Sequence, residues 1–248
     1  MLKKAIALNL DDLCLILGVP AGLFLLTHLI TAGVLVFFHA DSSLMISGAL
    51  LPVCSGILMA IVTVAHVGIS FFHFLRFGQT RQRALAQSMG IIAFEGGCSL
   101  AVTALLTALE HWVAPRLWLL LTGYPALEWG VDGMVVPDPA FGVSSALQPG
   151  SALLIEDFTL DWWWFPLLTL GGILIGIIIS TITARFGSRG GWALWCTWML
   201  MCFGPQLLGT QAILAGDFLI WTGVVVCISG LAALIWSFYF LLHAPVKN

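Results

Sequence analysis

The sequence predicts an all-α, polytopic integral membrane protein with six transmembrane helices, both termini in the cytoplasm and one large extracytoplasmic loop. Hydrophobic residues make up 60% of the 248 residues and charged residues only 8%. Soluble domains average roughly 25% charged residues. The composition therefore excludes soluble globular, disordered and nucleic-acid-binding proteins. Apolar stretches that are long enough to cross a bilayer also recur along the whole chain.

Six stretches with almost no charged residues define the expected helices. Each can cross a membrane once but not comfortably twice, because an α-helix rises 1.5 Å per residue and the bilayer needs about 20 apolar residues. The second stretch is the longest, so its helix is expected to tilt or to run on toward Phe74. Residues 1–248 are expected to form a single transmembrane domain. The expected spans are about 13–38, 44–74, 84–109, 162–184, 192–214 and 218–242.

The basic residues set the expected orientation. With the amino terminus inside, eight of the nine Lys and Arg residues fall on the cytoplasmic side, and only Arg116 lies outside. Residues 110–161 then form the extracytoplasmic loop. Its first part is rich in Trp and Leu and suggests an interfacial helix or re-entrant piece. Its later part, rich in Pro and Gly, suggests a compact or partly extended lobe.

Two cytoplasmic connections carry nearly all of the internal basic charge. They are FHFLRFGQTRQRALAQ, residues 72–87, and TARFGSRGGW, residues 183–192, and both contain Arg-Phe-Gly followed by another arginine. Gly78 can end the second helix, and Thr80 can cap a new helix that begins at Arg81. The first connection is therefore expected to form a short basic elbow. Such arginines usually retain the loop inside the cell and contact lipid phosphate, whereas the alternative is a docking surface for a cytoplasmic partner.

The stretch FFHFLRFGQTRQRALAQSMG, residues 71–90, resembles the permease subunits of bacterial type-2 ABC exporters. In these six-helix proteins the second helix ends in a phenylalanine-rich turn, followed by a Phe-Gly-x-Thr-Arg-type motif and the third helix. Phe77, Gly78, Thr80 and Arg81 occupy the motif positions. The second loop, with Phe186 at its centre, is similar to the corresponding family loop. The topology match covers the whole chain, and the motif match covers about ten residues.

The resemblance implies a translocation subunit of an ATP-driven transporter in a bacterial cytoplasmic membrane. A separate cytoplasmic ABC ATPase would hydrolyse ATP with Mg²⁺, and a second permease copy or homologue would complete the pathway. The chain itself is expected to be no enzyme and to hold no cofactor or metal, since it has no GxxxxGK[ST] motif and no recognisable catalytic constellation. Its apolar composition favours export of a peptide, lipid or drug. The residues expected to couple to the ATPase are Arg76, Phe77, Gly78, Gln79, Thr80, Arg81, Arg83, Arg185, Phe186, Gly187 and Arg189.

Polar residues within the expected spans are candidates for the translocation pathway. Glu95 is the one acidic residue expected well inside a span, and an intramembrane carboxylate is costly enough to suggest a function. Glu95 could equally be a hydrogen-bonded packing residue near Ser88. Gly204 and Pro205 are expected to interrupt the fifth helix. The candidate pathway residues are Glu95, His66, Gln206 and Gln211.

Two other classes of function stay open. A haem- or quinone-binding redox protein could use His28 and His66 as axial ligands. His66 and His73 are about 10 Å apart along one helix face, which is too far to bind one iron. The third class is a non-catalytic membrane scaffold. The six cysteines lie within the expected spans without a CxxC pair, so they are expected to be reduced core residues.

Overall fold

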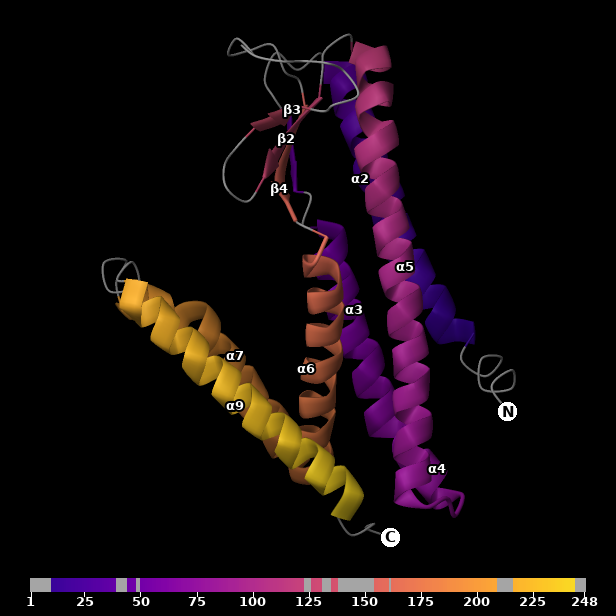
Figure 1. Ribbon diagram of the computed structural model, residues 1–248, viewed down its shortest axis with the longest axis vertical. Helices are drawn as coiled ribbons and strands as arrows, with labels where there is room; N and C mark the ends of the chain where they lie inside the picture. Colours follow the sequence, from indigo (N-terminus) through magenta and orange to yellow (C-terminus); the bar gives the residue numbers. More distant parts are fainter. Residues whose placement is uncertain are drawn as a thin grey trace. The chain divides into compact units, whose positions relative to one another are not determined.

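The computed structural model describes residues 10–38, 44–47, 50–122, 126–130, 135–137, 154–160, 162–208 and 216–243 (Figure 1). Structural statements below concern these residues. The first half of the chain forms α2 (Leu10–Phe38), β1 (Leu44–Ser47), α3 (Leu50–Ala65), the π-helix η1 (His66–Ser70), α4 (Phe71–Arg76) and α5 (Arg81–Thr122). The second half forms β2 (Ala126–Gly130), β3 (Val135–Pro137), β4 (Leu154–Thr159), α6 (Trp164–Phe186), α7 (Ser188–Leu208) and α9 (Gly216–His243).

Four of the described helical segments are long and apolar enough to cross a membrane. They are Asp11–Gly33, Leu50–Arg76, Arg81–Glu110 and Trp164–Phe186, and they correspond to the first four expected spans. These segments indicate a membrane protein. The fifth and sixth expected spans correspond to helices α7 and α9, and their crossing of the membrane stays a prediction. The cytoplasmic position of both termini also stays a prediction, because residues 1–9 and 244–248 lie outside the described part.

Helix α3 begins at Leu50, later than the expected start of the second span at residue 44, and residues 44–47 form strand β1 instead. Pro52 explains the difference. Pro52 lies in the first turn of α3, where the missing proline N–H removes no helical hydrogen bond. A helix that started at residue 44 would carry Pro52 in its interior and lose such a bond. Pro166 occupies the same early position in α6.

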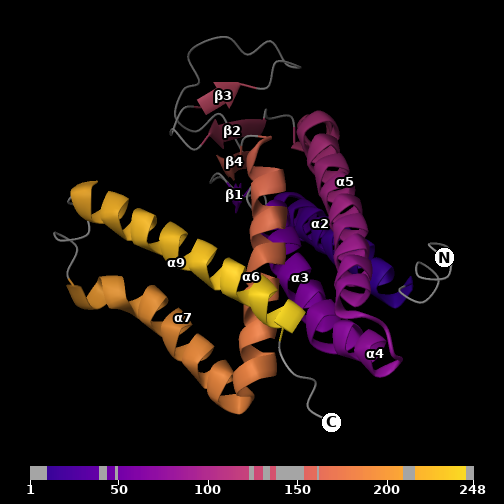
Figure 2. The same ribbon diagram turned by 60° about the horizontal axis from the view of Figure 1, so that its bottom comes forward.

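The four strands form one sheet in the order β1-β4-β2-β3, which can be followed by the labels in Figure 2. Strand β4 pairs in parallel with both β1 and β2, and β2 pairs antiparallel with β3. Three of the strands lie within residues 110–161, for which partly extended structure was expected. Because β1 leads into α3 and β4 leads into α6, the parallel pairing sends these two helices off in the same direction (Figure 1).

Helix α5 is continuous from Arg81 to Thr122 and contains Pro115. The stretch after residue 110, for which an interfacial helix or re-entrant piece was expected, continues this helix without a break. The described helix α7 likewise continues through Gly204 and Pro205 to Leu208, so this pair does not end the helix. Residues 209–215 of the fifth expected span lie outside the described part.

The chain divides into two compact units, which we describe separately. The first comprises Met1–Met59 and Phe94–Gly171, and the second comprises Ala60–Ala93 and Gly172–Asn248. The first unit holds α2 and the sheet. The second unit holds η1, α4, α9 and both basic loops. The boundaries between the units fall within helices α3, α5 and α6.

Helices α3 and α6 approach each other closely at glycines within each unit. In the first unit, a Cβ atom placed on Gly56 would lie 2.9 Å from the backbone oxygen of Leu168. In the second unit, a Cβ atom on Gly176 would lie 2.7 Å from the backbone oxygen of Ala60 and 2.7 Å from Cβ of Thr63. Small residues permit this backbone approach, which is how helices associate in lipid without a hydrophobic driving force between them.

Replacing Gly176 with alanine should destabilise the protein, because the new methyl group meets backbone atoms that cannot move alone. We expect a loss of about 1–3 kcal/mol, as for overpacked cores. Thermal unfolding in detergent micelles measures this change. The matched control is Gly171→Ala in the same helix, where a Cβ atom meets nothing within 4 Å and no destabilisation is expected. Equal stability of the two variants would contradict the close packing.

Candidate functional site

The first basic loop, residues 77–80, begins with a fixed turn at the end of α4. The N–H of Gly78 donates to the carbonyl of Leu75 at 3.1 Å, and the N–H of Gln79 donates to the carbonyl of Phe74 at 3.2 Å. These two bonds form a Schellman motif, which satisfies carbonyl groups that the helix end leaves free. Gly78 has φ +77°, a backbone conformation that favours glycine. The expectation that Gly78 ends this helix is confirmed.

The helix restarts immediately after this turn. The N–H of Ala84 donates to the carbonyl of Thr80 at 2.9 Å, so Thr80 is the cap residue of α5 and Arg81 its first residue, as expected. The second basic loop uses the same device at Gly187, which has φ +60°. Its N–H donates to the carbonyl of Thr183 at 2.8 Å. Both Arg-Phe-Gly sequences therefore end a helix at a glycine of positive φ, but the first turn is a Schellman motif and the second has the single bond of an αL motif.

Each turn leaves its phenylalanine exposed. Phe77 is 74% exposed and Phe186 is 52% exposed, although the ring of Phe77 also contacts the ring of His73 edge to face at 5.0 Å. Four of the arginines that were expected to contact the ATPase are exposed: Arg76, Arg83, Arg185 and Arg189. Thr80 is also exposed. Gln79 is half-buried, and its Oε1 atom has no hydrogen-bond partner among the described residues.

The two loops contact the same end of helix α9. Nη1 of Arg81 donates a hydrogen bond to the carbonyl oxygen of Leu241 at 3.3 Å, in the last turns of that helix. A cation at a helix C-terminus is favourable, because the unpaired carbonyls there carry partial negative charge. The guanidinium group of Arg185 lies over the rings of Trp236 and Phe240 at 5.1 and 5.5 Å. Arg81 and Arg185 thus have structural contacts that the sequence did not reveal.

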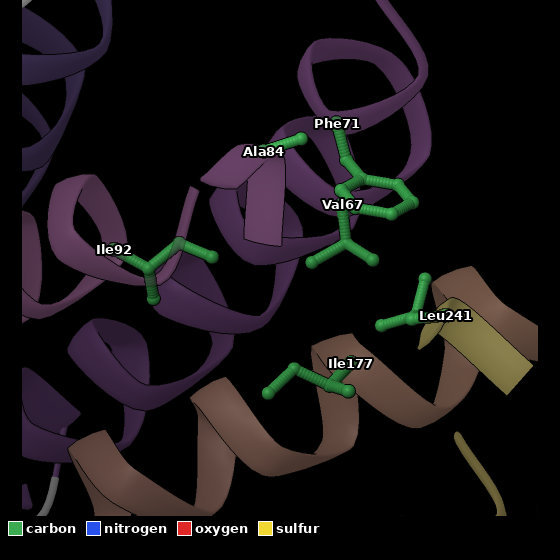
Figure 3. Packing of buried hydrophobic residues seen from close by; sticks show 6 residues of the cluster. All are labelled: Val67, Phe71, Ala84, Ile92, Ile177 and Leu241. Carbon is green, nitrogen blue, oxygen red and sulfur yellow. The ribbon is translucent and has the colours of Figure 1, made fainter. Parts of the chain in front are cut away.

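A buried apolar cluster supports the first loop. Phe71 of α4 and Ala84 of α5, which flank the loop, are both almost fully buried in it. Figure 3 shows Val67, Phe71, Ile177 and Leu241 pointing toward one another from separate segments. The cluster joins helices η1, α4, α5, α6 and α9 within the second unit and consists of Val67, Phe71, Ala84, Ile92, Ile177 and Leu241. Displacing the loop would therefore disturb packing among all of these helices.

Glu95 lies in the first unit and is 1% exposed. Oxygen atoms of Glu95 and Asp12 approach to within 4.8 Å of each other, with Asp12 in the first turn of α2. Two carboxylate oxygens at this distance can coordinate one cation between them. The sequence analysis recognised Glu95 but missed Asp12, because Asp12 served there only as the boundary of the first span.

Histidines of the two units have different surroundings. His28 belongs to the first unit, where its Nδ1 lies 2.9 Å from the carbonyl of Phe24 and its Nε2 lies 3.9 Å from Oε1 of Glu110. The Nδ1 contact is a hydrogen bond to the backbone, whereas the longer Nε2 contact is an ion pair only when the ring is protonated. His66 is buried at the start of the π-helix η1 in the second unit, with its Nδ1 3.5 Å from Oγ of Ser70. Single π-turns within α-helices frequently mark functional positions.

The remaining candidates are placed only in part. Gln206 belongs to α7, and Gln211 lies outside the described residues. The described cysteines, Cys14, Cys54, Cys98, Cys196 and Cys227, are free, but Cys14, Cys196 and Cys227 are exposed, so the expectation that they are core residues is wrong for these three.

Comparison of the chain with protein-family models, with curated proteins and with solved structures finds no match.

Replacing Gly78 with alanine should destabilise the first loop, because a side chain at this backbone conformation costs about 1–2 kcal/mol. The cause is conformational, since a Cβ atom there would meet nothing within 4 Å. Chemical unfolding in micelles measures the change. Gly90→Ala is the matched control, because Gly90 lies within helix α5, has equally open space and gains helix propensity as alanine. If Gly78→Ala unfolds no earlier than Gly90→Ala, the turn does not require glycine.

Proposed function

We propose that this chain is the transmembrane permease subunit of an ATP-driven ABC transporter and that its first basic loop docks a separate cytoplasmic ATPase. One observation carries the proposal: the loop holds an exposed phenylalanine, Phe77, on a glycine-fixed turn between arginines. This arrangement fits the exporter family that residues 71–90 resemble. An apolar anchor surrounded by charge is also the usual composition of a protein interface.

The exposure of Phe77 gives docking an energetic advantage. Burying a phenylalanine side chain contributes about 1.5–3 kcal/mol. The Schellman turn fixes the backbone of the loop before the partner binds. The loop therefore loses little further conformational entropy on association. Arg76 and Arg83 are exposed near Phe77 in sequence and would steer an acidic groove toward it. Arg81 is committed to the carbonyl of Leu241, so its role in docking would be to hold the loop in place.

The loop is suited to transmit movement. Its two flanking residues, Phe71 and Ala84, belong to the buried cluster that joins five helices of the second unit. Packed interiors transmit displacement because they are hardly compressible. A movement of the ATPase at Phe77 would then shift these helices together, which is the coupling that alternating access requires.

The membrane, the substrate class, the second subunit and the pathway residues of the transporter follow from the same assignment. The transporter would reside in a bacterial cytoplasmic membrane and export amphipathic or hydrophobic substrates such as peptides, lipids or drugs. A second permease copy or homologue would complete the pathway. Glu95, with Asp12 beside it, and His66 are the candidate polar groups of that pathway, together with Gln206 and Gln211.

Replacing Phe77 with alanine should weaken docking by at least about tenfold, because truncating a buried aromatic anchor commonly costs 2 kcal/mol or more. The experiment co-expresses the chain with a candidate ABC ATPase and measures co-purification and ATP hydrolysis in mild detergent. Arg83→Glu should also reduce association. Phe94→Ala is the matched control, since Phe94 is an exposed phenylalanine in the span of α5 and should retain the ATPase.

The possible outcomes test the docking site and the transporter assignment separately. If the ATPase binds wild type, Phe77→Ala and Arg83→Glu equally well, the docking surface is elsewhere. If no ABC ATPase binds the wild-type chain, the transporter assignment itself is wrong. Purification with a bound haem, visible as a Soret band, would support the redox class instead.

A further inference from the structure

Arg185 is held in place by three aromatic rings at the last turn of α6. Its guanidinium carbon lies 5.4 Å from the ring centre of Phe186, 5.1 Å from that of Trp236 and 5.5 Å from that of Phe240. The rings of Phe186 and Trp236 are nearly parallel, at 12°, and those of Trp236 and Phe240 at 18°. A guanidinium group over an aromatic face keeps its in-plane N–H groups available as donors.

Among the described residues, Arg185 has no ion pair with Asp or Glu, and its side chain is exposed. The next ionisable residue along the chain is another arginine, Arg189, which is also exposed. The rings fix the position of the guanidinium group, but a π-face carries no net charge. The arrangement therefore leaves a preoriented cation whose planar donor edge is complementary to a phosphate group.

Helix α7 starts three residues after Arg185 in the sequence and has unpaired backbone donors at its N-terminus. The carbonyl of Gly187 accepts from the N–H groups of Gly190 and Gly191 at 3.1 and 3.3 Å, so Gly187 caps this helix. The N–H groups of Ser188 and Arg189 are the first two of α7 and have no acceptor within the helix. Trp192, in the next turn, is 67% exposed, and exposed tryptophans are typical of the membrane-water interface.

We propose that Arg185, stacked on Phe186, Trp236 and Phe240, binds the phosphate group of an anionic phospholipid of the cytoplasmic leaflet. The guanidinium edge supplies the charged donors, and Trp192 lies beside the acyl chains. This site is more specific than the general attraction of basic loops to anionic membranes, because it depends on one arginine and its aromatic support. It does not depend on an ATPase and can be tested on the chain alone.

The experiment measures retention of phosphatidylglycerol by native mass spectrometry and the rise in melting temperature that this lipid produces in neutral micelles. Arg185→Gln should weaken phosphatidylglycerol binding about tenfold, because a charge-assisted contact is lost. Arg185→Lys keeps the charge but loses the planar donor edge and should bind with intermediate affinity. The matched control is Arg83→Gln. Arg83 is exposed, and among the described residues no aromatic ring contacts its guanidinium group. This variant should bind phosphatidylglycerol like wild type.

Phosphatidylcholine should give no comparable effect, and inorganic phosphate should not replace phosphatidylglycerol. The proposal is overturned if Arg83→Gln loses as much lipid as Arg185→Gln, since the effect would then be general charge. It is also overturned if inorganic phosphate stabilises the chain as much as phosphatidylglycerol does. A third contradicting result is an Arg185→Gln variant that is folded in neutral micelles and still binds phosphatidylglycerol with wild-type affinity. Trp236→Leu tests the platform: unchanged lipid affinity in that variant would contradict the role of the rings.

Discussion

The close approach of helices α3 and α6 is the contact on which the described architecture depends. At Gly56 and again at Gly176, the partner backbone occupies the space where a side chain would lie. Within a lipid environment, close packing of small residues brings helices together where hydrophobic burial cannot. Helix α3 continues through η1 and α4 into the first basic loop, and α6 ends at the second. The two loops therefore extend from two helices that are packed almost backbone to backbone.

Local signals in the sequence predicted the loops well. Gly78, Thr80 and Arg81 form the expected break, cap and new helix start, because turn and cap conformations depend on neighbouring residues. The convergence of both loops on α9 could not be predicted, since Arg81 and Leu241 are joined only by folding. The same is true of the platform that α9 provides for Arg185.

Other features were missed although the sequence carried a signal for them. Pro52 within a long apolar run indicates a helix start near residue 50, and the small residues Gly172, Gly176 and Ser180 recur every fourth position on α6. Asp12 was read only as the edge of a span, so its approach to Glu95 went unrecognised. A polar residue at the end of one helix finds its partner through tertiary packing, which a single sequence does not reveal.

The contacts divide the expected coupling residues into two groups. Arg81 and Arg185 are engaged with α9, whereas Phe77 is exposed on its fixed turn. The most direct test of the account places a photo-cross-linking amino acid at position 77, with position 94 as control, in the chain co-expressed with the candidate ABC ATPase. The account predicts a cross-link to the ATPase from position 77 alone. Cross-links to lipid only, or equal ATPase cross-linking from position 94, would contradict it.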